Sequence, residues 1–368
     1  MISIGFDVSD VCTARADGTT HYTLELLREF SAPEFSAHWN FFAPCPAPTS
    51  TTLPSKSTWH SSPFPKYWTQ LRFPFDLAKV NPDVLFMPIQ QLPIMRPRKM
   101  KTVAVIHDLA FHYFPEHTLR KDWALLHLFT AQVAREADRI IAISQHTADD
   151  IAKFYGRTEG VHVVHHGVNH SFFRPASSAE LTDTWKDLTE YIPSLAPNFI
   201  LTVGQIQPRK NLVRLVEAYE QWRDEGGDSQ LVLAGGHGWK QKEIERRVQS
   251  SKYKDSIFMP GVVPNELLRA LYWHAGIFTV PSLYEGFGMP VIEAMASGAP
   301  VMVSNTSCLP EIAGNAGVLI DPSSCHAIAR GITETFTRRD ELIALGFSRA
   351  QDFSWIETAR NTFNVVSS

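Results

Sequence analysis

Short runs of consecutive apolar residues recur along the whole chain, separated by longer stretches in which apolar positions repeat every three or four residues. The short runs predict buried β-strands, and the longer stretches predict amphipathic helices. Residues 44–65 are rich in Pro, Ser and Thr and carry no period, so we expect a long surface loop there. In the first half, the predicted strands are residues 2–6, 84–87, 102–106, 139–143 and 161–165, and the predicted helices are residues 19–30, 67–79 and 119–137.

Residues 171–197 break this rhythm with Pro175, Pro193 and a pair of serines, and they predict the start of a second domain. The alternation then resumes, with predicted strands at residues 199–203, 230–234, 257–259, 277–280, 301–303 and 318–320, and helices at residues 212–223, 240–250, 265–274 and from about 289. Apolar strands that alternate with helices are typical of parallel sheets covered on both faces. We therefore predict an α/β protein with two Rossmann-like domains, residues 1–170 and 171–352.

Composition narrows the class of protein. A chain of 368 residues with 44% hydrophobic and 20% charged residues is long enough for two globular domains. The net charge of −4 argues against a nucleic-acid-binding protein. Four distant cysteines without a C-x-x-C pair predict neither a metal site nor a disulfide framework, which fits a reducing cytoplasm. We expect no secretion signal and no apolar run of the roughly 20 residues that span a bilayer.

The segment that follows the predicted strand at residues 277–280 carries the clearest chemistry. Gly286 and Gly288 allow a sharp turn, and Pro290 suits the first turn of a helix. A strand, a glycine turn and a helix N-terminus bind anions and hydroxyls, because backbone N–H groups and the helix dipole point at the ligand. Glu285 in the turn and Glu293 on the helix add two carboxylates, which suit a ligand rich in hydroxyls, such as ribose or a hexose.

A basic pair, Arg209 and Lys210, follows a strand that ends at Gly204 and precedes the next helix. A guanidinium fork and an ammonium group both suit a pyrophosphate. The alternative is a solvated basic pair. Because the helix dipole disfavours cations at a helix N-terminus, a bound anion explains the pair better.

These residues, taken together, give the chain a strong resemblance to glycosyltransferase family 4, retaining enzymes of the GT-B fold. The run E-G-F-G-M-P-V-I-E from Glu285 to Glu293 resembles the paired-glutamate motif of that family, and residues 203–211 resemble its diphosphate-binding turn. Residues 105–109 and 166–169 resemble its N-domain active-site strand end and its interdomain crossing, so the likeness extends over residues 2–366. The resemblance implies two domains facing across a cleft that closes on the donor, with a helix at about residues 353–368 packing back on the first domain.

The resemblance also implies roles for individual residues. Glu285 would contact the transferred sugar, Glu293 would hold the nucleotide ribose, and His107 would contact a donor-sugar hydroxyl near the bond that breaks. Arg209, Lys210 and backbone donors would stabilise the leaving diphosphate. The other donor-binding candidates are Gly18, Thr19, Gly204, Val262, Gly286, Phe287, Gly288 and Met289, and the acceptor-side candidates are His21, Asp108 and His112.

Several of these candidates have simpler interpretations. Gly18 and Thr19 could form an ordinary helix N-cap, and His21 could lie on a helix surface. His112 is in an aromatic loop, where packing competes with acceptor contact. His107 and Asp108 could be half of a metal-dependent phosphohydrolase site, but further His and Asp ligands at helical spacing do not accompany them, so we expect no metal.

The expected function is transfer of a hexose, with retention, from a nucleotide diphosphate sugar to a hydroxyl of a glycan or lipid-linked glycan. The nucleotide sugar is a co-substrate, and no cofactor is expected. Residues 208–211, 238–239 and 284–288 look most like mannosyltransferases that use GDP-mannose to build polysaccharides. Alternatives are a UDP- or dTDP-sugar transferase, a nucleotide-sugar epimerase and a non-catalytic sugar-nucleotide sensor. An NAD dehydrogenase is disfavoured, because no G-x-G-x-x-G follows the first strand.

A basic cluster of Arg96, Arg98, Lys99 and Lys101 lies between prolines and a strand. A solvated loop is the default interpretation. If the acceptor is bound to a membrane, this cluster could contact anionic lipid, and the cytoplasmic protein would then be peripheral at the inner face of the membrane.

Overall fold

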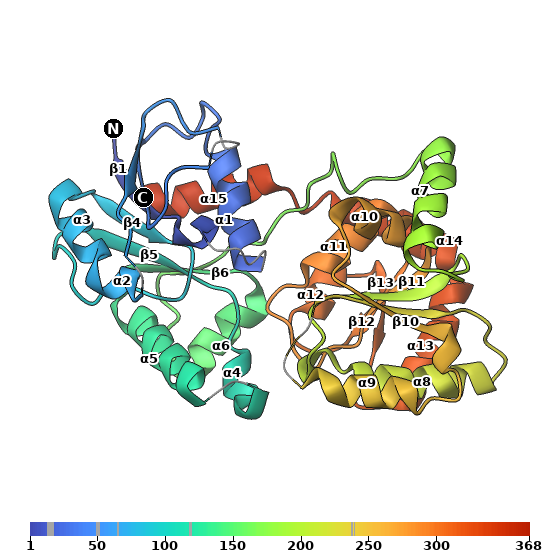
Figure 1. Ribbon diagram of the computed structural model, residues 1–368. Coiled ribbons are helices and arrows are strands. Elements are labelled where there is room, and N and C mark those ends of the chain that lie inside the picture. Colours follow the sequence, from blue (N-terminus) through green and yellow to red (C-terminus); the bar gives the residue numbers. More distant parts are fainter. Residues whose placement is uncertain (13–17, 49–51, 65, 118–119, 237, 239) are drawn as a thin grey trace. The chain divides into compact units, whose positions relative to one another are not determined.

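The computed structural model describes residues 1–368 except 13–17, 49–51, 65, 118–119, 237 and 239 (Figure 1). The chain forms two compact units, one of Met1–Gly167 with Trp355–Ser368 and the other of Val168–Ser354. Each unit has a parallel sheet between helices. Every helix within the described residues is too short or too polar to cross a membrane.

The first unit contains a seven-stranded sheet in the order β3-β2-β1-β4-β5-β6-β7, and all neighbouring strands are parallel. The strand order reverses between β1 and β4, and such a switch point places the loops after the two strands on either side of a crevice. The strands are β1 (Ser3–Asp7), β2 (His38–Ala43), β3 (Ser57–Ser61), β4 (Val84–Met87), β5 (Lys101–Ile106), β6 (Arg139–Ala142) and β7 (Val161–Val163).

Helices of the first unit pack on this sheet, and the last helix of the chain lies beside α1 (Figure 1). Fully buried residues such as Phe42, Leu85 and Ile140 form the core beneath them, which explains the apolar strands. The helices are α1 (Gly18–Glu29), α2 (Trp68–Leu71), α3 (Phe73–Val80), α4 (Ala110–Tyr113), α5 (Arg120–Glu136), α6 (Gln145–Tyr155) and α15 (Trp355–Ser367), with 3₁₀ turns η1 (Ser9–Cys12) and η2 (Pro115–His117).

The second unit contains a six-stranded parallel sheet in the order β10-β9-β8-β11-β12-β13, and its switch point lies between β8 and β11. Buried Val216, Tyr219 and Ile277 belong to its core. The strands are β8 (Phe199–Val203), β9 (Leu231–Ala234), β10 (Ile257–Gly261), β11 (Ala275–Val280), β12 (Val301–Ser304) and β13 (Gly317–Ile320).

Helices of the second unit begin at recognisable caps in several places. In α7, Ser177 and Glu180 form a capping box, in which each side chain bonds the backbone N–H of the other. The helices are α7 (Ser178–Tyr191), α8 (Leu212–Asp224), α9 (Gln241–Gln249), α10 (Asn265–His274), α11 (Met289–Ser297), α12 (Leu309–Ala313), α13 (Cys325–Thr337) and α14 (Arg339–Ala350), with 3₁₀ turns η3 (Pro208–Lys210) and η4 (Lys254–Ser256).

The expectation of a loop throughout residues 44–65 is wrong, because β3 lies within it and pairs with β2. As an edge strand it has a neighbour on one side only, and its partly exposed residues need no apolar pattern. The single helix expected at residues 67–79 is divided at Arg72 into α2 and α3, and Pro74 lies in the first turn of α3.

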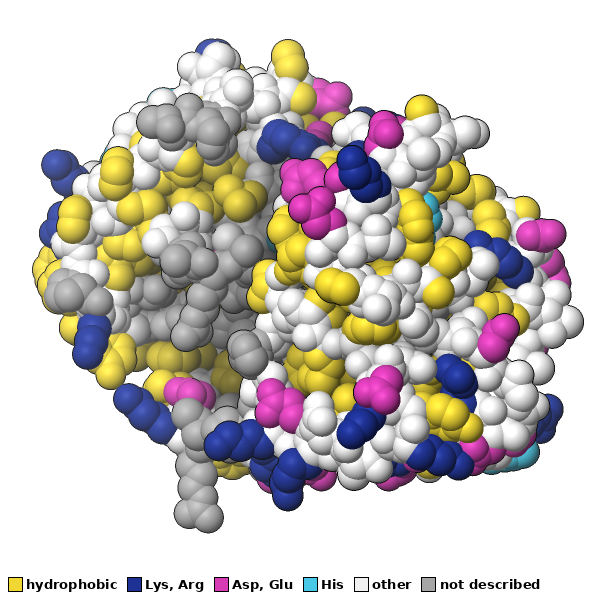
Figure 2. All heavy atoms as spheres, turned by 45° about the vertical axis from the view of Figure 1, so that its right-hand side comes forward, with side chains coloured by type: hydrophobic (Ala, Val, Ile, Leu, Met, Phe, Trp, Pro, Cys, Tyr) yellow, Lys and Arg dark blue, Asp and Glu magenta, His cyan; other side chains and the backbone are white. Residues whose placement is uncertain are grey.

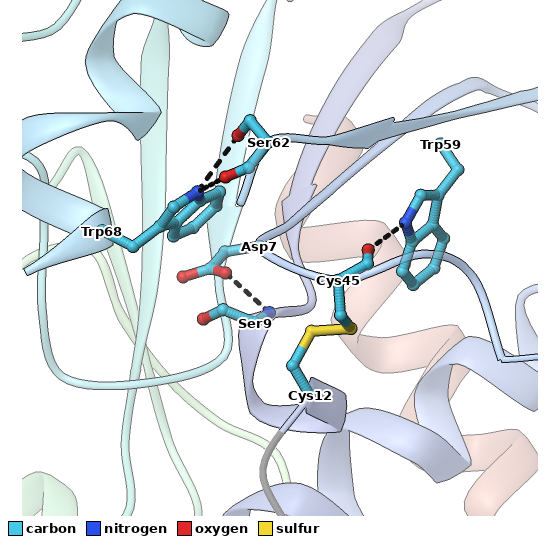
Figure 3. The surroundings of a disulfide bond; sticks show 7 residues. All are labelled: Asp7, Ser9, Cys12, Cys45, Trp59, Ser62 and Trp68. Atoms are coloured by element: carbon cyan, nitrogen blue, oxygen red, sulfur yellow. Dashed lines mark hydrogen bonds between the residues drawn. A yellow bond between two sulfur atoms is a disulfide. The ribbon is translucent and has the colours of Figure 1, made fainter. Parts of the chain in front are cut away.

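A disulfide joins Cys12 to Cys45, contrary to the expectation that the cysteines form none (Figure 3). Because β1 and β2 are parallel neighbours, with Asp7 opposite Phe42, the segments that leave them start from the same edge of the sheet. The two Cα atoms lie 5.7 Å apart, although 33 residues separate them in sequence. The expectation of a reducing compartment, which rested on the absence of disulfides, therefore loses its support. The other two cysteines, Cys308 and Cys325, are free thiols.

Candidate active site

The loops after β8 and β11, which carry the predicted donor-binding residues, meet at the switch point of the second unit. The two strands are hydrogen-bonded neighbours in the sheet. Beyond their carboxyl ends, the backbone N–H of Leu283 donates to the carbonyl of Arg209 at 2.9 Å. The turn that carries Arg209 and Lys210 is thus bonded directly to the turn that carries Glu285, as a ligand site at a switch point requires.

Glu285 is the centre of this arrangement and is buried. Lys210 Nζ lies 2.7 Å from Glu285 Oε1, and Arg209 Nη1 lies 3.3 Å from Glu285 Oε2. The hydroxyl of Ser282 donates to Oε1 at 2.6 Å. Burial by itself would raise the pKa of Glu285, but Lys210 and Arg209 hold that pKa below its ordinary value. Glu285 is therefore a carboxylate, and the two cations beside it are set in a largely buried position.

Asn211 fixes the turn that bears the two cations. Its backbone has a positive φ of 59°, and its side-chain amide donates to the carbonyls of Pro281 at 3.0 Å and Pro322 at 2.7 Å. Arg209 Nη1 also donates to the carbonyl of Tyr284 at 2.7 Å. Loops after three strands are tied together by these bonds, so the cations are held in place before any ligand binds.

Two glycines let the loops after β8 and β9 come close together beneath Lys210. Gly204 has a φ of 143°, and a Cβ atom on it would lie 3.2 Å from Lys210 Cε. Gly235 has a φ of 151°, and a Cβ atom on it would collide with the carbonyl group of Gly204. Larger residues at either position would displace the lysine or the loop beneath it.

The glycine turn leads into α11 as the sequence predicted. Gly288 is the N-cap with a φ of 94°, Met289 begins the helix, and a proline lies in its first turn. The carbonyl of buried Phe287 accepts a hydrogen bond from Cys308 Sγ at 3.1 Å. The backbone N–H of Glu285 donates to Ser307 Oγ at 3.1 Å, which fixes the start of the turn that continues through Gly286.

Glu293 lies one turn further along α11 and faces α10. Its Oε2 accepts a hydrogen bond of 2.9 Å from the hydroxyl of Tyr272, which is fully buried. Burial raises the pKa of Glu293 to about 7, although the Tyr272 hydrogen bond opposes the rise. Glu293 can therefore change its charge near neutral pH. Val262, another donor-binding candidate, is 73% exposed after β10.

In the first unit, His107 follows β5 and belongs to an aromatic cluster. Its Nε2 donates to the carbonyl of Pro88, just beyond β4, at 2.6 Å. Its ring stacks on His166 at 5.6 Å between centroids, and the ring of Tyr22 is packed edge-on against both. Burial first, and His107 second, hold the pKa of His166 well below its ordinary value.

The acceptor-side candidates have different surroundings. His21 packs edge-on against Trp355 at 5.6 Å, beside the His107 cluster. Asp108 Oδ1 accepts from the backbone N–H of Ala110 at 3.1 Å. His112 is stacked on Phe154 at 4.0 Å, with a pKa lowered to about 4, chiefly by burial.

The remaining candidates lie at the start of α1 or outside the description. Gly18 begins α1, and the carbonyl of Thr19 accepts from Thr23 Oγ1 at 3.0 Å. Residues 14–17, which precede Gly18, and Trp239, in the pair 238–239 that resembles mannosyltransferases, lie outside the described residues. Within the described part of the chain, no group of three or more His, Cys, Asp and Glu side chains could hold a metal ion.

Sequence reasoning missed three residues that position the site of the second unit, namely Asn211, Ser282 and Ser307, and it also missed the buried Asp7 of the first unit. Asp7 ends β1, is fully buried, and accepts a hydrogen bond from the backbone N–H of Ser9 at 2.9 Å (Figure 3). Burial raises its pKa to about 7, against the lowering effect of Ser9. Its position after the first strand was a usable signal, whereas serines in loops give none.

Comparison with known proteins agrees with this geometry. The family described as Glycosyl transferases group 1 matches residues 183–346, and that described as Glycosyltransferase Family 4 matches residues 16–172. O-antigen chain mannosyltransferase B of Escherichia coli is 30% identical over 272 residues, covering 73% of this chain and 70% of that protein. Serotype-specific mannosyltransferase WbdA of Escherichia coli is 31% identical over 270 residues, but those residues cover only 32% of its length.

Solved structures show the same fold at low sequence identity. Sucrose-phosphate synthase from Thermosynechococcus elongatus has a TM-score of 0.76 at 20% identity, covering 98% of this chain and 97% of that one. Anabaena Alr3699/HepE in complex with UDP and glucose has a TM-score of 0.74 at 16% identity, covering 100% of both chains. The predicted family and fold class are confirmed: the chain belongs to glycosyltransferase family 4 and is a glycosyltransferase of the GT-B fold.

Proposed function

We propose that this glycosyltransferase moves a hexose from a nucleotide diphosphate sugar to a hydroxyl of a glycan or lipid-linked glycan, with retention at the anomeric carbon. The observation that carries the proposal is the set of Arg209, Lys210 and Glu285 at the switch point of the second unit. Two preorganised cations suit a diphosphate, and a carboxylate between them suits the hydroxyls of the attached sugar.

The proposed chemistry follows from those groups. The bond between the anomeric carbon and the diphosphate oxygen breaks, a bond from the acceptor oxygen forms on the same face, and the acceptor proton passes to the leaving phosphate. Arg209 and Lys210 stabilise the negative charge that develops on that phosphate. The hydrogen bonds of both side chains to Glu285 keep the two cations positioned.

We assign the nucleotide ribose to Glu293 and the acceptor side to the first unit. There His21, an acceptor-side candidate, and His107, which would contact the donor sugar, belong to one aromatic cluster. His112 fits a packing role better, because it lies between Phe154 and the Tyr155 hydroxyl, 2.8 Å away. Transfer should therefore need both units, whereas nucleotide binding should need only the second.

Mannose from GDP-mannose is the donor we favour. The support comes from relatives of this chain, among them the O-antigen mannosyltransferases of Escherichia coli and Salmonella typhimurium. We propose a corresponding place in polysaccharide biosynthesis, at the inner face of a membrane. A UDP- or dTDP-sugar donor is the alternative.

A panel of nucleotide sugars tests the proposal. Each is incubated with the protein and a glycan acceptor, release of nucleotide diphosphate is followed, and the anomeric configuration of the product is determined by NMR. We expect transfer with retention from GDP-mannose. Conversion of a nucleotide sugar without an acceptor would instead show an epimerase, and tight binding without turnover of any donor would show a sensor.

A further inference from the structure

We propose that one face of the first unit, formed by α2, α3 and residues 92–101, docks on a membrane surface that contains anionic lipid. We call this face the docking surface. The inference rests on the proposed function, because a lipid-linked acceptor would lie in the membrane to which the docking surface binds. It rests on exposed side chains outside the site described above.

Large hydrophobic side chains project from this face. Tyr67 at the N-cap of α2, Leu71 in α2 and Phe75 in α3 are each at least half exposed. Ile94 and Met95 are 66% and 57% exposed. A protein that works alone in water seldom exposes so many large apolar groups close together.

Hydrogen bonds tie these two sets of side chains to each other. Gln70, the residue before Leu71, donates through Nε2 to the carbonyl of Leu92 at 3.0 Å. Its Oε1 accepts from the backbone N–H of Ile94, also at 3.0 Å. The loop that presents Ile94 is thereby fastened to α2, so the exposed apolar groups form one neighbouring set.

Positive charge surrounds the apolar groups. Residues 64–101 contain seven Lys and Arg but two Asp and Glu, a local charge of +5 in a chain whose net charge is −4. Arg96 is paired with Glu136 at 3.1 Å, whereas exposed Arg98 and Lys99 form no ion pair with any described residue. By contrast, the view in Figure 2 shows basic and acidic side chains interspersed over its right-hand part.

The charge selects the occupant. An apolar face with a rim of unpaired cations complements a bilayer interface, where apolar tips enter the acyl boundary and cations remain among acidic headgroups. A hollow of about 690 Å³ beside these cations is lined by four basic side chains, Arg96, Arg98, Lys99 and Lys101, and by two acidic ones, Glu136 and Asp138. The basic groups outnumber the acidic ones, and the volume offers room for such a headgroup. Protein–protein interfaces are depleted in lysine, whereas this face carries Lys99 and Lys101.

Vesicle sedimentation tests the docking surface. The full chain is mixed with phosphatidylcholine vesicles, with and without phosphatidylglycerol. The variants are Ile94→Ser with Met95→Ser, and Arg98→Ala with Lys99→Ala. The matched control is Lys242→Ala with Lys254→Ala, two exposed lysines of the second unit. We expect binding only to the anionic vesicles, weakened by salt, and a loss of about tenfold or more in each docking-surface variant but not in the control.

Calorimetry with GDP on the same variants separates this inference from the proposed function, because Arg209 and Lys210 belong to the second unit and the docking surface to the first. We expect unchanged GDP affinity in all variants. The inference would be overturned if the native protein did not bind anionic vesicles, or if the docking-surface variants bound them as tightly as the native protein does. Variants that lose self-association or a protein complex while vesicle binding stays intact would also overturn it. Vesicle binding without any binding of nucleotide diphosphates would refute the proposed function alone.

Discussion

Lys210 Nζ lies 2.7 Å from Glu285 Oε1, a contact between residues that are 75 positions apart in sequence. The lysine leaves the loop after β8 and the glutamate leaves the loop after β11, so the contact spans the switch point of the second sheet. Both side chains are mostly buried, at 17% and 8% exposure, and so neither charge is well solvated without the other.

Removing one member of this pair should therefore cost more than removing both. In Lys210→Met, Glu285 keeps Arg209 at 3.3 Å but loses its closer cation, and we expect a loss of about 3 kcal/mol in the free energy of unfolding. The double variant Lys210→Met with Glu285→Gln should recover much of that loss. Urea unfolding of the single and double variants measures both values, and a double variant no more stable than Lys210→Met would contradict the coupling.

Gly204→Ala should damage the cation site without a change in charge. The φ of 143° strains any residue with a side chain, and the added methyl would press on Lys210 Cε from 3.2 Å. We expect weaker nucleotide-diphosphate binding by about tenfold, measured by calorimetry. Gly226→Ala provides the control, since Gly226 also has a positive φ but open space around it. Equal losses in both variants would show that backbone strain alone is responsible.

The raised pKa of Glu293 predicts nucleotide binding that depends on pH. If ribose hydroxyls donate to its carboxylate, binding requires the ionised form, whose share rises through a pKa of about 7. GDP affinity should then increase by up to about tenfold from pH 6 to pH 8, and Glu293→Gln should abolish the increase.

The sign for stability is opposite. A folded-state pKa above the unfolded value gives stability that is present below the unfolded pKa and is lost as pH rises through about 7. The free energy of unfolding of Glu293→Gln, measured in urea at pH 6 and pH 8, should therefore change less between the two pH values than that of the native protein. A Glu293→Gln variant with the native pH profile of GDP binding would exclude Glu293 as the ribose ligand.

The Cys12–Cys45 disulfide should stabilise the first unit. A cross-link that closes a loop of 33 residues removes unfolded-state entropy worth about 3–4 kcal/mol. Cys12→Ser with Cys45→Ser should lose about that much stability, whereas Cys325→Ser, which changes a free thiol, should lose little. Alkylation of the denatured protein should label two cysteines before reduction and four after it; four labelled before reduction would mean that the bond does not form.

Two central strands were predicted in their full extent, whereas β2 was missed although five of its residues are buried, and β7 was predicted although it is largely exposed. Residues 84–87 and 199–203 are predicted with the same bounds that β4 and β8 have, because a central parallel strand is a continuous apolar run. The edge strand β3 was not predicted, because its residues are partly exposed and form no continuous apolar run. Helix α6 was also missed, although Ser144 caps it by accepting from the backbone N–H of Thr147.

Much of the site was visible in sequence because glycine turns and charged residues follow apolar strands there. The contacts between loops were not visible, since they depend on which strands lie side by side. That β8 neighbours β11 brings Lys210 to Glu285, and that β1 neighbours β2 brings Cys12 to Cys45. Neither adjacency follows from residue types or spacing.

Binding of GDP to single variants of the two units tests the central claim most directly. Calorimetry is performed on the native protein, Arg209→Ala, Lys210→Ala and His107→Ala, with the fold of each checked by circular dichroism. The account predicts that Arg209→Ala and Lys210→Ala each weaken GDP binding tenfold or more, because a charge-assisted contact is worth about 1.5–3 kcal/mol. It predicts that His107→Ala binds GDP as the native protein does but fails in transfer. Native GDP affinity in both cation variants would contradict the claim that the switch point of the second unit holds the donor diphosphate.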